Sequence, residues 1–472
     1  MRRPSAPVAA VVAALAMATA LLGGPGFPSV PTAVLFLVAY GGLGVVLVDG
    51  RHLDRRLVIG LGFGLVVLAV ARPPMQSHDL WSYVMYGREL SHHHVSPYTH
   101  APDLFAHDPF LHRVDPLWRH AESVYGPLFT AWSGIITLVG GSVTLLLRLG
   151  FQLTAAVAVL AAAHLVDRRT NGDPRALAVV LLNPLVVFSL VNDAHVDALV
   201  GLAVLGSVLL LERRRPALAG GVLGLAVLVK VIALLPAGAI GLWMLSRRRR
   251  WSAIAPFALA LGVVVLLGYG AGGGRSAVQP VLDSSSRVSG ASIWGPPNRS
   301  AIDTEEHQGD APAVAKKEAG RSLSRYGTLS VVVLTTALAL LFAGEAVPIL
   351  AAGGAILAYT LVGAYVYPWY AAGALFVLAL RRRSPLLGVL LALSAVLQIA
   401  EVPGRQFLAF ANRQQRFPDP GWHKWFRAHG APALDLLLLG ALLVLLGRTF
   451  LRDRAARSSP HDVVGEEREQ VD

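Results

Sequence analysis

The sequence predicts an all-α, polytopic membrane protein with long loops on one side of the membrane. Of the 472 residues, 54% are hydrophobic and only 15% are charged, and the mean hydropathy is +0.56. This composition is far from that of a soluble domain. A net charge of +12 would suggest nucleic-acid binding in a soluble protein. Here the arginines form short clusters between apolar runs, as the orientation rule for membrane proteins requires, so no nucleic-acid partner is predicted.

Three apolar runs open the chain, at 8–23, 30–48 and 57–71, and each is expected to form a membrane helix. The arginines before the first run fit a signal peptide, and a retained helix fits equally well. The linker 49–56 carries three arginines and a histidine and is therefore expected in the cytoplasm. The third helix then delivers residues 72–125 to the outside as a first outer loop.

The next two apolar runs, at about 128–140 and 143–166, lead to a basic patch at 167–175. Two full crossings would leave this patch outside, against the charge rule. Either one of the two runs is re-entrant or the rule is violated locally, and the sequence does not decide between these alternatives.

Further helices are expected along the rest of the chain, and arginine clusters at 212–215, 247–250 and 381–383 mark the cytoplasmic turns. The apolar run 217–246 is too long for one crossing, so it is interpreted as two short helices with Lys230 at the outer turn. The remaining helices are expected near 176–191, 194–211, 251–270, 327–343, 346–366, 384–400 and 433–449.

Two more outer loops are predicted, at 271–325 and at 401–430. The first of these is rich in Gly, Ser and Pro, and much of it is expected to be mobile. The prediction is therefore one transmembrane domain over 1–452 with about 13 helices. The polar tail 453–472 is expected to be disordered in the cytoplasm.

The first outer loop holds most of the candidate chemistry, because residues 75–127 contain eight of the fifteen histidines together with six acids and six Trp or Tyr residues. A connection this long favours a functional loop. Asp79 follows directly after a helix exit. It could cap the next short helix, or it could act as a general base that deprotonates an acceptor hydroxyl. Arg88 could bind a phosphate, which the guanidinium fork suits.

Other candidate positions carry two interpretations each. Asp193 and Asp197 are four residues apart, which fits either a capped helix start or substrate binding. Lys230 lies inside an apolar run, where it could contact a phosphate or extend to the interface. Six of the nine tryptophans fall on the predicted outer side, and aromatic surfaces suit sugar rings.

No metal site and no cofactor are predicted, although a divalent metal is left open. Cysteine is absent, which excludes a disulfide framework, a thiolate metal site and a thiol nucleophile. The run His92–His94 suggests a metal site, but three consecutive residues do not converge on one face of a helix.

The loop resembles a known family. Its segments SHDLWSYVMYGRELSHHHVSPYTHAP and DPFLHRVDPLWRHAESVYGPLF are similar to the first outer loop of actinobacterial polyprenol-phosphate-mannose-dependent α-(1→6)-mannosyltransferases, of the GT-C superfamily, and glycosyltransferase family 87 is also similar. The segments NPLVVFSLVNDAHVDAL, GLAVLVKVIALLP and YPWY further along are similar in type and order.

This resemblance implies a GT-C-like helical bundle in the cell membrane whose active face is extracytoplasmic. It implies transfer of mannose from a polyprenyl-phosphate donor to a mannan or glycolipid acceptor of the cell envelope, with inversion and an α-(1→6) product. Asp79 would be the catalytic base. The substrate-binding residues would be Tyr83, Arg88, Tyr98, Tyr125, Asp193, His195, Asp197, Lys230, Trp369 and Tyr370.

The alternative function from another class is a secondary transporter of a lipid or polar solute. Such a protein would show inverted repeats and ionisable residues at the middle of the membrane. The order of elements shows no repeat, and the polar groups concentrate at one face.

Overall fold

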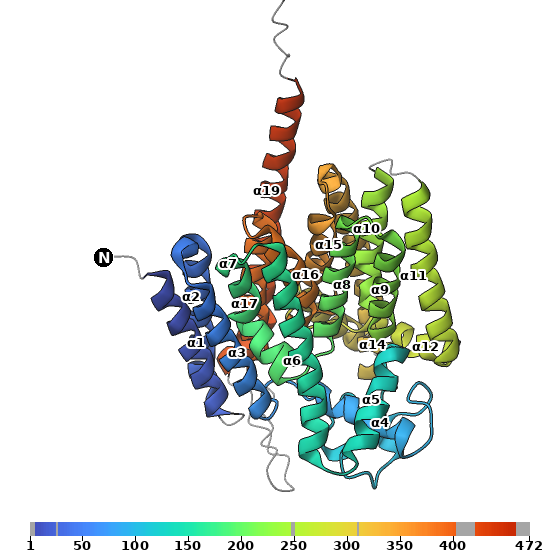
Figure 1. The fold of residues 1–472 in the computed structure, drawn as a ribbon. Coiled ribbons are helices and arrows are strands. Elements are labelled where there is room, and N and C mark those ends of the chain that lie inside the picture. The colour runs from blue at the N-terminus through green and yellow to red at the C-terminus, as the bar shows by residue number, and fades with distance from the viewer. Residues whose placement is uncertain (1–4, 25–26, 247–250, 309–310, 403–420, 459–472) are drawn as a thin grey trace, which may run out of the picture.

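The protein is described from a computed structural model covering residues 5–24, 27–246, 251–308, 311–402 and 421–458. Within these ranges every regular element is a helix, and the helices pack side by side into one bundle (Figure 1). The last part of the predicted third outer loop, from residue 421, is described, whereas residues 403–420 and the end of the predicted tail, 459–472, lie outside the described residues.

The first half of the chain contributes α1 (Ala6–Gly23), α2 (Ser29–Asp49), η1 (Gly50–His52), α3 (Arg55–Ala71), α4 (Asp79–Ser91), η2 (Pro102–Leu104), η3 (Leu111–Arg113), α5 (Pro127–Gly140), α6 (Thr144–Arg169), α7 (Pro174–Leu181), η4 (Val186–Asn192), α8 (Asp197–Glu212), α9 (Pro216–Val229), η5 (Val231–Ala233) and α10 (Leu234–Ser246).

The second half contributes α11 (Trp251–Ala271), α12 (Arg275–Asp283), η6 (Ser284–Ser286), α13 (Gly295–His307), α14 (Pro312–Leu341), η7 (Phe342–Gly344), α15 (Ile349–Val362), η8 (Pro368–Ala371), α16 (Ala372–Leu378), η9 (Ala379–Arg381), α17 (Pro385–Glu401), α18 (Gly421–Trp425), η10 (Phe426–Gly430) and α19 (Ala431–Ser458).

The prediction of an all-α polytopic membrane protein is confirmed. Among the described residues, six helices are long and apolar enough to cross a membrane, or up to seven if the bent pair α7 and η4 forms one span. Shorter apolar helices, including α9, α15 and α17, lie among them. Large apolar side chains on the outer helices are exposed, as on Leu266 of α11 and Leu437 of α19, which fits contact with lipid.

The described arginine-rich turns at 49–56, 167–175 and 212–215 lie at one end of the bundle, where ion pairs join them. Arg55 at the start of α3 donates to Asp167 near the end of α6 at 2.7 and 2.6 Å. Arg169 pairs with Glu212 at the end of α8. The basic patch 167–175 therefore lies at the same end as the linker 49–56, and we call this the arginine end.

Helix α5 is the apolar run that does not reach the arginine end. It lies with α4 at the lower end of the bundle, whereas α6 runs upward from there (Figure 1). A Cβ atom on Gly87 of α4 would lie 2.4 Å from the Ser133 carbonyl oxygen, so only glycine allows α4 and α5 to pack this closely. With α5 placed in this way, the basic patch 167–175 lies beside the linker 49–56, as in the alternative in which one of the two runs is re-entrant.

The segment 271–325 contains more regular structure than the sequence predicts. It forms α12 and α13, and α14 begins at Pro312 rather than near residue 327. Ser289 N–H donates to the Ala364 carbonyl at 2.8 Å, and the Trp294 indole donates to the Val362 carbonyl, also at 2.8 Å. These long-range contacts hold the segment against the end of α15, which a Gly- and Ser-rich composition does not reveal.

Candidate functional site

A broken helix fixes the position where α4 begins. Helices α7 and η4 bend by 52° around residues 182–185. The Asn192 amide at the end of η4 donates to the carbonyls of Ala69 and Pro73, both at 3.0 Å. Asp193 then accepts the backbone N–H groups of Met75 and Gln76. The chain that leads into α4 is thus bound to the end of η4.

Strained backbone follows at the same point. Ala194 has a φ of 59°, a left-handed conformation that is uncommon for a residue with a Cβ atom. Such strain often marks functional sites, because surrounding contacts must hold it in place. Here it turns the fully buried His195 side chain toward Asp79, the first residue of α4.

A cavity of about 400 Å³ opens beside Asp79. Residues from all three predicted outer loops line it, together with the turn after α9 and the end of α15. The lining side chains used below are Asp79, Trp118, Tyr125, Lys230, Arg287, Tyr367, Trp369, Tyr370 and Glu401. We call this space the central cavity.

Asp79 is the carboxylate best placed for chemistry in the central cavity. Its Oδ2 atom lies 3.5 Å from the Tyr125 hydroxyl and 3.5 Å from Nδ1 of His195. Its side chain is 19% exposed, so it is partly desolvated and still reachable from the cavity. A base with this combination of access and flanking groups can accept a proton from a bound hydroxyl.

Aromatic rings form one wall of the cavity. The Trp369 ring stacks on His195 with centroids 3.7 Å apart and on Tyr367 with centroids 4.6 Å apart. Both pairs are close to parallel, at 12° and 10°. The wall therefore connects the Asp79 neighbour His195 to the YPWY segment, and the Trp369 ring, which is 8% exposed, is held between His195 and Tyr367.

Lys230 lies at the cavity in an ion pair with Asp197. Its ammonium donates to both carboxylate oxygens at 3.0 and 2.8 Å, and it lies 4.2 Å from the centroid of the Tyr370 ring. Gly126 allows the first outer loop to pack closely against the end of α9, because a Cβ atom on this residue would lie 2.2 Å from the Leu228 carbonyl oxygen. The structure thus brings together Asp79, Tyr125, His195, Asp197, Lys230, Trp369 and Tyr370.

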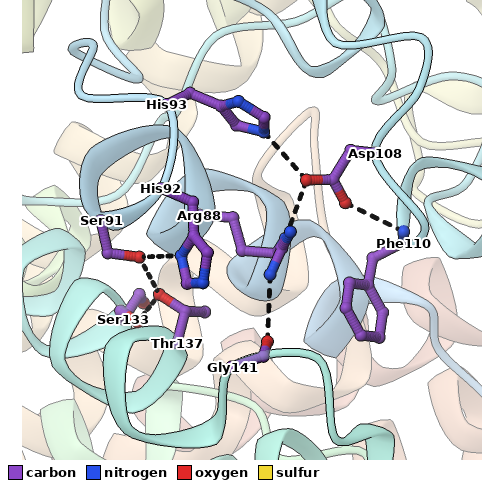
Figure 2. A network of polar contacts seen from close by, with 9 residues as sticks. All are labelled: Arg88, Ser91, His92, His93, Asp108, Phe110, Ser133, Thr137 and Gly141. Atoms are coloured by element: carbon purple, nitrogen blue, oxygen red, sulfur yellow. Dashed lines mark hydrogen bonds and ion pairs between the residues drawn. The ribbon is translucent and has the colours of Figure 1, made fainter.

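Arg88, which the sequence suggested as a phosphate ligand, lies away from the cavity in another network (Figure 2). Its guanidinium donates to Asp108 at 2.8 Å and to the Gly141 carbonyl at 3.0 Å, and it is buried. His93 contacts the same carboxylate oxygen at 2.9 Å. Burial alone would raise the pKa of Asp108, but the Phe110 N–H, Arg88 and His93 together lower it. Arg88 therefore joins the first loop to α4 and α5.

Three other predicted substrate-binding residues have partners inside the protein instead of at the cavity. Tyr83 is 1% exposed, and its hydroxyl lies 3.5 Å from Nδ1 of His195. Tyr98 donates to the Tyr125 carbonyl and to Thr130. Asp193 holds the backbone before α4, as described above. These residues support the site from behind, so direct contact with a substrate is not expected of them.

Three charged residues of the cavity were not among the predicted site residues, namely Asp115, Arg287 and Glu401. Arg287 lies just after η6, in a stretch whose composition indicated mobility, and Glu401 ends α17. Arg287 stacks on Trp118 with its Cζ atom 4.1 Å from the ring centroid. In the sequence, the only indication of a role for Arg287 was that it lies in a predicted outer loop and outside the arginine clusters.

Within the described ranges, no group of three or more His, Asp or Glu side chains is arranged to hold a metal ion. The His92–His94 run does not converge: His92 contacts the Ser91 hydroxyl, and His93 contacts Asp108. His94 has a φ of 55°, which turns the chain at the end of α4.

The fold and this site define a polytopic membrane protein with an acid-bearing, aromatic-walled cavity at one end. Residues 29–247 match the family model described as "Alpha-(1->6)-mannopyranosyltransferase, N-terminal domain". The family resemblance inferred from the loop is therefore confirmed: this part of the chain is similar to that domain.

Curated relatives with the name "Alpha-(1->6)-mannopyranosyltransferase A" give the same result. The Mycobacterium tuberculosis protein is 28% identical over 253 residues, which are 49% of this chain and 48% of the relative. The Corynebacterium glutamicum protein is 31% identical over 200 residues, which are 40% of this chain and 38% of the relative. The matched region thus spans about half or less of each relative's length.

Proposed function

We propose that this protein is a membrane mannosyltransferase that uses polyprenyl-phosphate mannose as its donor. It transfers the mannosyl residue to a mannan or glycolipid acceptor on the outer face of the cell membrane and forms an α-(1→6) linkage with inversion. The similarity to mannopyranosyltransferases over residues 29–247 supports the reaction class. The arginine-rich turns at the far end of the bundle support an outward-facing cavity.

One observation carries this proposal, namely the placement of Asp79 at the central cavity. Its carboxylate faces a space walled by Trp369 and Tyr370, with Lys230 and Arg287 on the same lining. A sugar ring on the aromatic wall would have a carboxylate and a cation within one cavity. Those are the groups that a transfer from a phosphate to a hydroxyl requires.

The reaction would be a single displacement. The acceptor hydroxyl oxygen forms a bond to the anomeric carbon as the bond from that carbon to the phosphate oxygen breaks. Asp79 takes the hydroxyl proton, and the phosphate leaves with the bonding electron pair. His195 and Tyr125, each 3.5 Å from the Asp79 carboxylate, orient it toward the acceptor. Attack opposite to the leaving group inverts the β-linkage of the donor.

A second cavity supports a lipid-linked donor. It is an apolar groove of about 700 Å³ between α5, α6, α8 and α9. Phe129 and Val229 line it, and they lie close in sequence to Tyr125 and Lys230 of the central cavity. Gly126 N–H donates to the Val229 carbonyl at 3.0 Å and joins the two regions. An isoprenoid chain in this groove would have its phosphate near the central cavity.

The test is a transfer assay with the purified full chain, a mannoside acceptor and radiolabelled polyprenyl-phosphate mannose. The expected product is labelled and is cleaved by an α-mannosidase that is specific for 1→6 linkages. A nucleotide sugar alone should give no product. Transfer from the nucleotide sugar, in the absence of any lipid donor, would contradict the proposal.

A further inference from the structure

The phosphate of the donor requires a cation that is not already neutralised. Among the described residues that line the central cavity, the Lys and Arg side chains are Lys230 and Arg287. Lys230 is paired with Asp197 through two short contacts, so much of its charge is already balanced. A phosphate that approached Lys230 would also meet the nearby Asp197 carboxylate, which would repel it.

Arg287 differs from Lys230 in what surrounds it. In the described part of the chain, no carboxylate lies within ion-pair distance of its guanidinium. Its main contact is the Trp118 ring, at 4.1 Å. Stacking uses the face of the guanidinium plane and leaves the N–H groups at its edge available, which is the geometry in which arginine binds a phosphate with two parallel hydrogen bonds.

We infer that Arg287, held on Trp118, is the residue that binds the phosphate group of the lipid-linked donor. This inference rests on the proposed function and assigns the anion site within it. Arg287 binds the phosphate in the donor complex and stabilises the negative charge that collects on the phosphate as the glycosidic bond breaks. Trp118 is a positioning residue, because it fixes the plane of the guanidinium.

The chain offers a matched control for this site. Arg113 also stacks on an indole of the same loop, with its Cζ atom 4.7 Å from the Trp81 ring centroid. Neither Arg113 nor Trp81 lines the central cavity. Loss of Arg113 therefore removes the same charge and the same kind of stacking contact from the protein without changing the cavity.

The experiment measures binding of farnesyl phosphate, and separately of uncharged farnesol, to the purified full chain. Arg287→Gln should weaken farnesyl phosphate binding at least ~10-fold, because a charge-assisted bidentate contact is lost. Arg287→Lys should recover part of the affinity, since it keeps the charge and loses the fork. Farnesol binding should not change in either variant, and unchanged farnesol binding also shows that the variants are folded.

Wild-type affinity of Arg287→Gln for farnesyl phosphate would overturn the assignment. An equal loss in Arg113→Gln would also overturn it, because the effect would then be one of overall charge. The proposed function is tested separately by mannose transfer. A protein that binds farnesyl phosphate through Arg287 but transfers no mannose would retain this anion site and lose the proposed function.

Discussion

The two ends of the helical bundle use charged residues in opposite ways. At the arginine end, exposed arginines pair with acids on neighbouring turns, as in Arg55 with Asp167 and Arg169 with Glu212. At the cavity end, the charged groups are partly or wholly buried and face a space lined by aromatic rings. Exposed pairs contribute little stability, whereas buried ionisable groups are costly and are kept where they have a role.

Substitution of Asp79 should have the largest effect on activity, because the chemistry takes place at the cavity end. Asp79→Asn keeps the size of the side chain and removes its basicity, so kcat should fall by ~10²–10⁴-fold. Asp103→Asn is the control, since Asp103 lies in the same loop and pairs with the exposed His120. Transfer assays on both variants check this. A fully active Asp79→Asn variant would show that another residue is the catalytic base.

The next largest effect, a loss of stability, is expected when the Lys230–Asp197 ion pair is broken. Lys230→Met leaves the buried Asp197 carboxylate without its partner, which should cost about 3–5 kcal/mol of stability. The double variant Lys230→Met/Asp197→Leu should recover most of this loss, because no unpaired charge remains. Thermal unfolding in detergent measures both. If the double variant is as unstable as the single one, the pair is not the source of the effect.

The raised pKa of Glu89 in α4 predicts that the stability of the protein depends on pH. Burial, with the nearby acids Asp108, Asp103 and Glu122, raises the pKa of Glu89 to about 9. Because the folded protein holds this proton more tightly than the unfolded chain, stability should fall as pH rises from about 5 to 9, by about 1.4 kcal/mol per pH unit.

The variant Glu89→Gln should lower this slope by about 1.4 kcal/mol per pH unit and should unfold at a higher temperature than the wild type at pH 8. Neither carboxylate oxygen of Glu89 has a hydrogen-bond partner among the described residues, which agrees with a protonated, uncharged side chain. Unfolding of both proteins across this pH range measures the difference. Identical slopes would show that Glu89 is not the group that titrates.

The smallest effect is expected at the arginine end. Arg169→Ala breaks an exposed pair with Glu212, so stability should change by no more than ~1 kcal/mol. The kcat of mannose transfer should stay at the wild-type value. A large loss of transfer activity in this variant would remove the distinction between the two ends.

The sequence predicts most of the helices, because apolar runs and arginine clusters are local signals. It did not decide that α5 stays with α4, because that depends on the close packing at Gly87 and on the Arg55–Asp167 pair, which joins positions far apart in the chain. Similarly, composition indicated a mobile segment at 271–325, whereas the described part of this segment is largely helical and contacts Val362 and Ala364.

In the candidate site, too, local sequence signals could be used for some residues, whereas others depend on contacts between distant parts of the chain. Asp79, Lys230 and Trp369 could be proposed from their position at helix exits and from the family resemblance. The sequence suggested Arg88 and missed Arg287, because the difference lies in their partners: Asp108 neutralises Arg88, and Arg287 stacks on Trp118. Partners that are distant in sequence decide which arginine is available to a ligand.

The central claim is that mannosyl transfer takes place in the central cavity at the Asp79 end of the bundle. A cryo-EM map of the Asp79→Asn variant with polyprenyl-phosphate mannose tests it most directly. We expect density for the sugar against Trp369, with its phosphate near Arg287 and its lipid chain along the groove that Phe129 lines. Donor density at the arginine end, with an empty central cavity, would contradict the account.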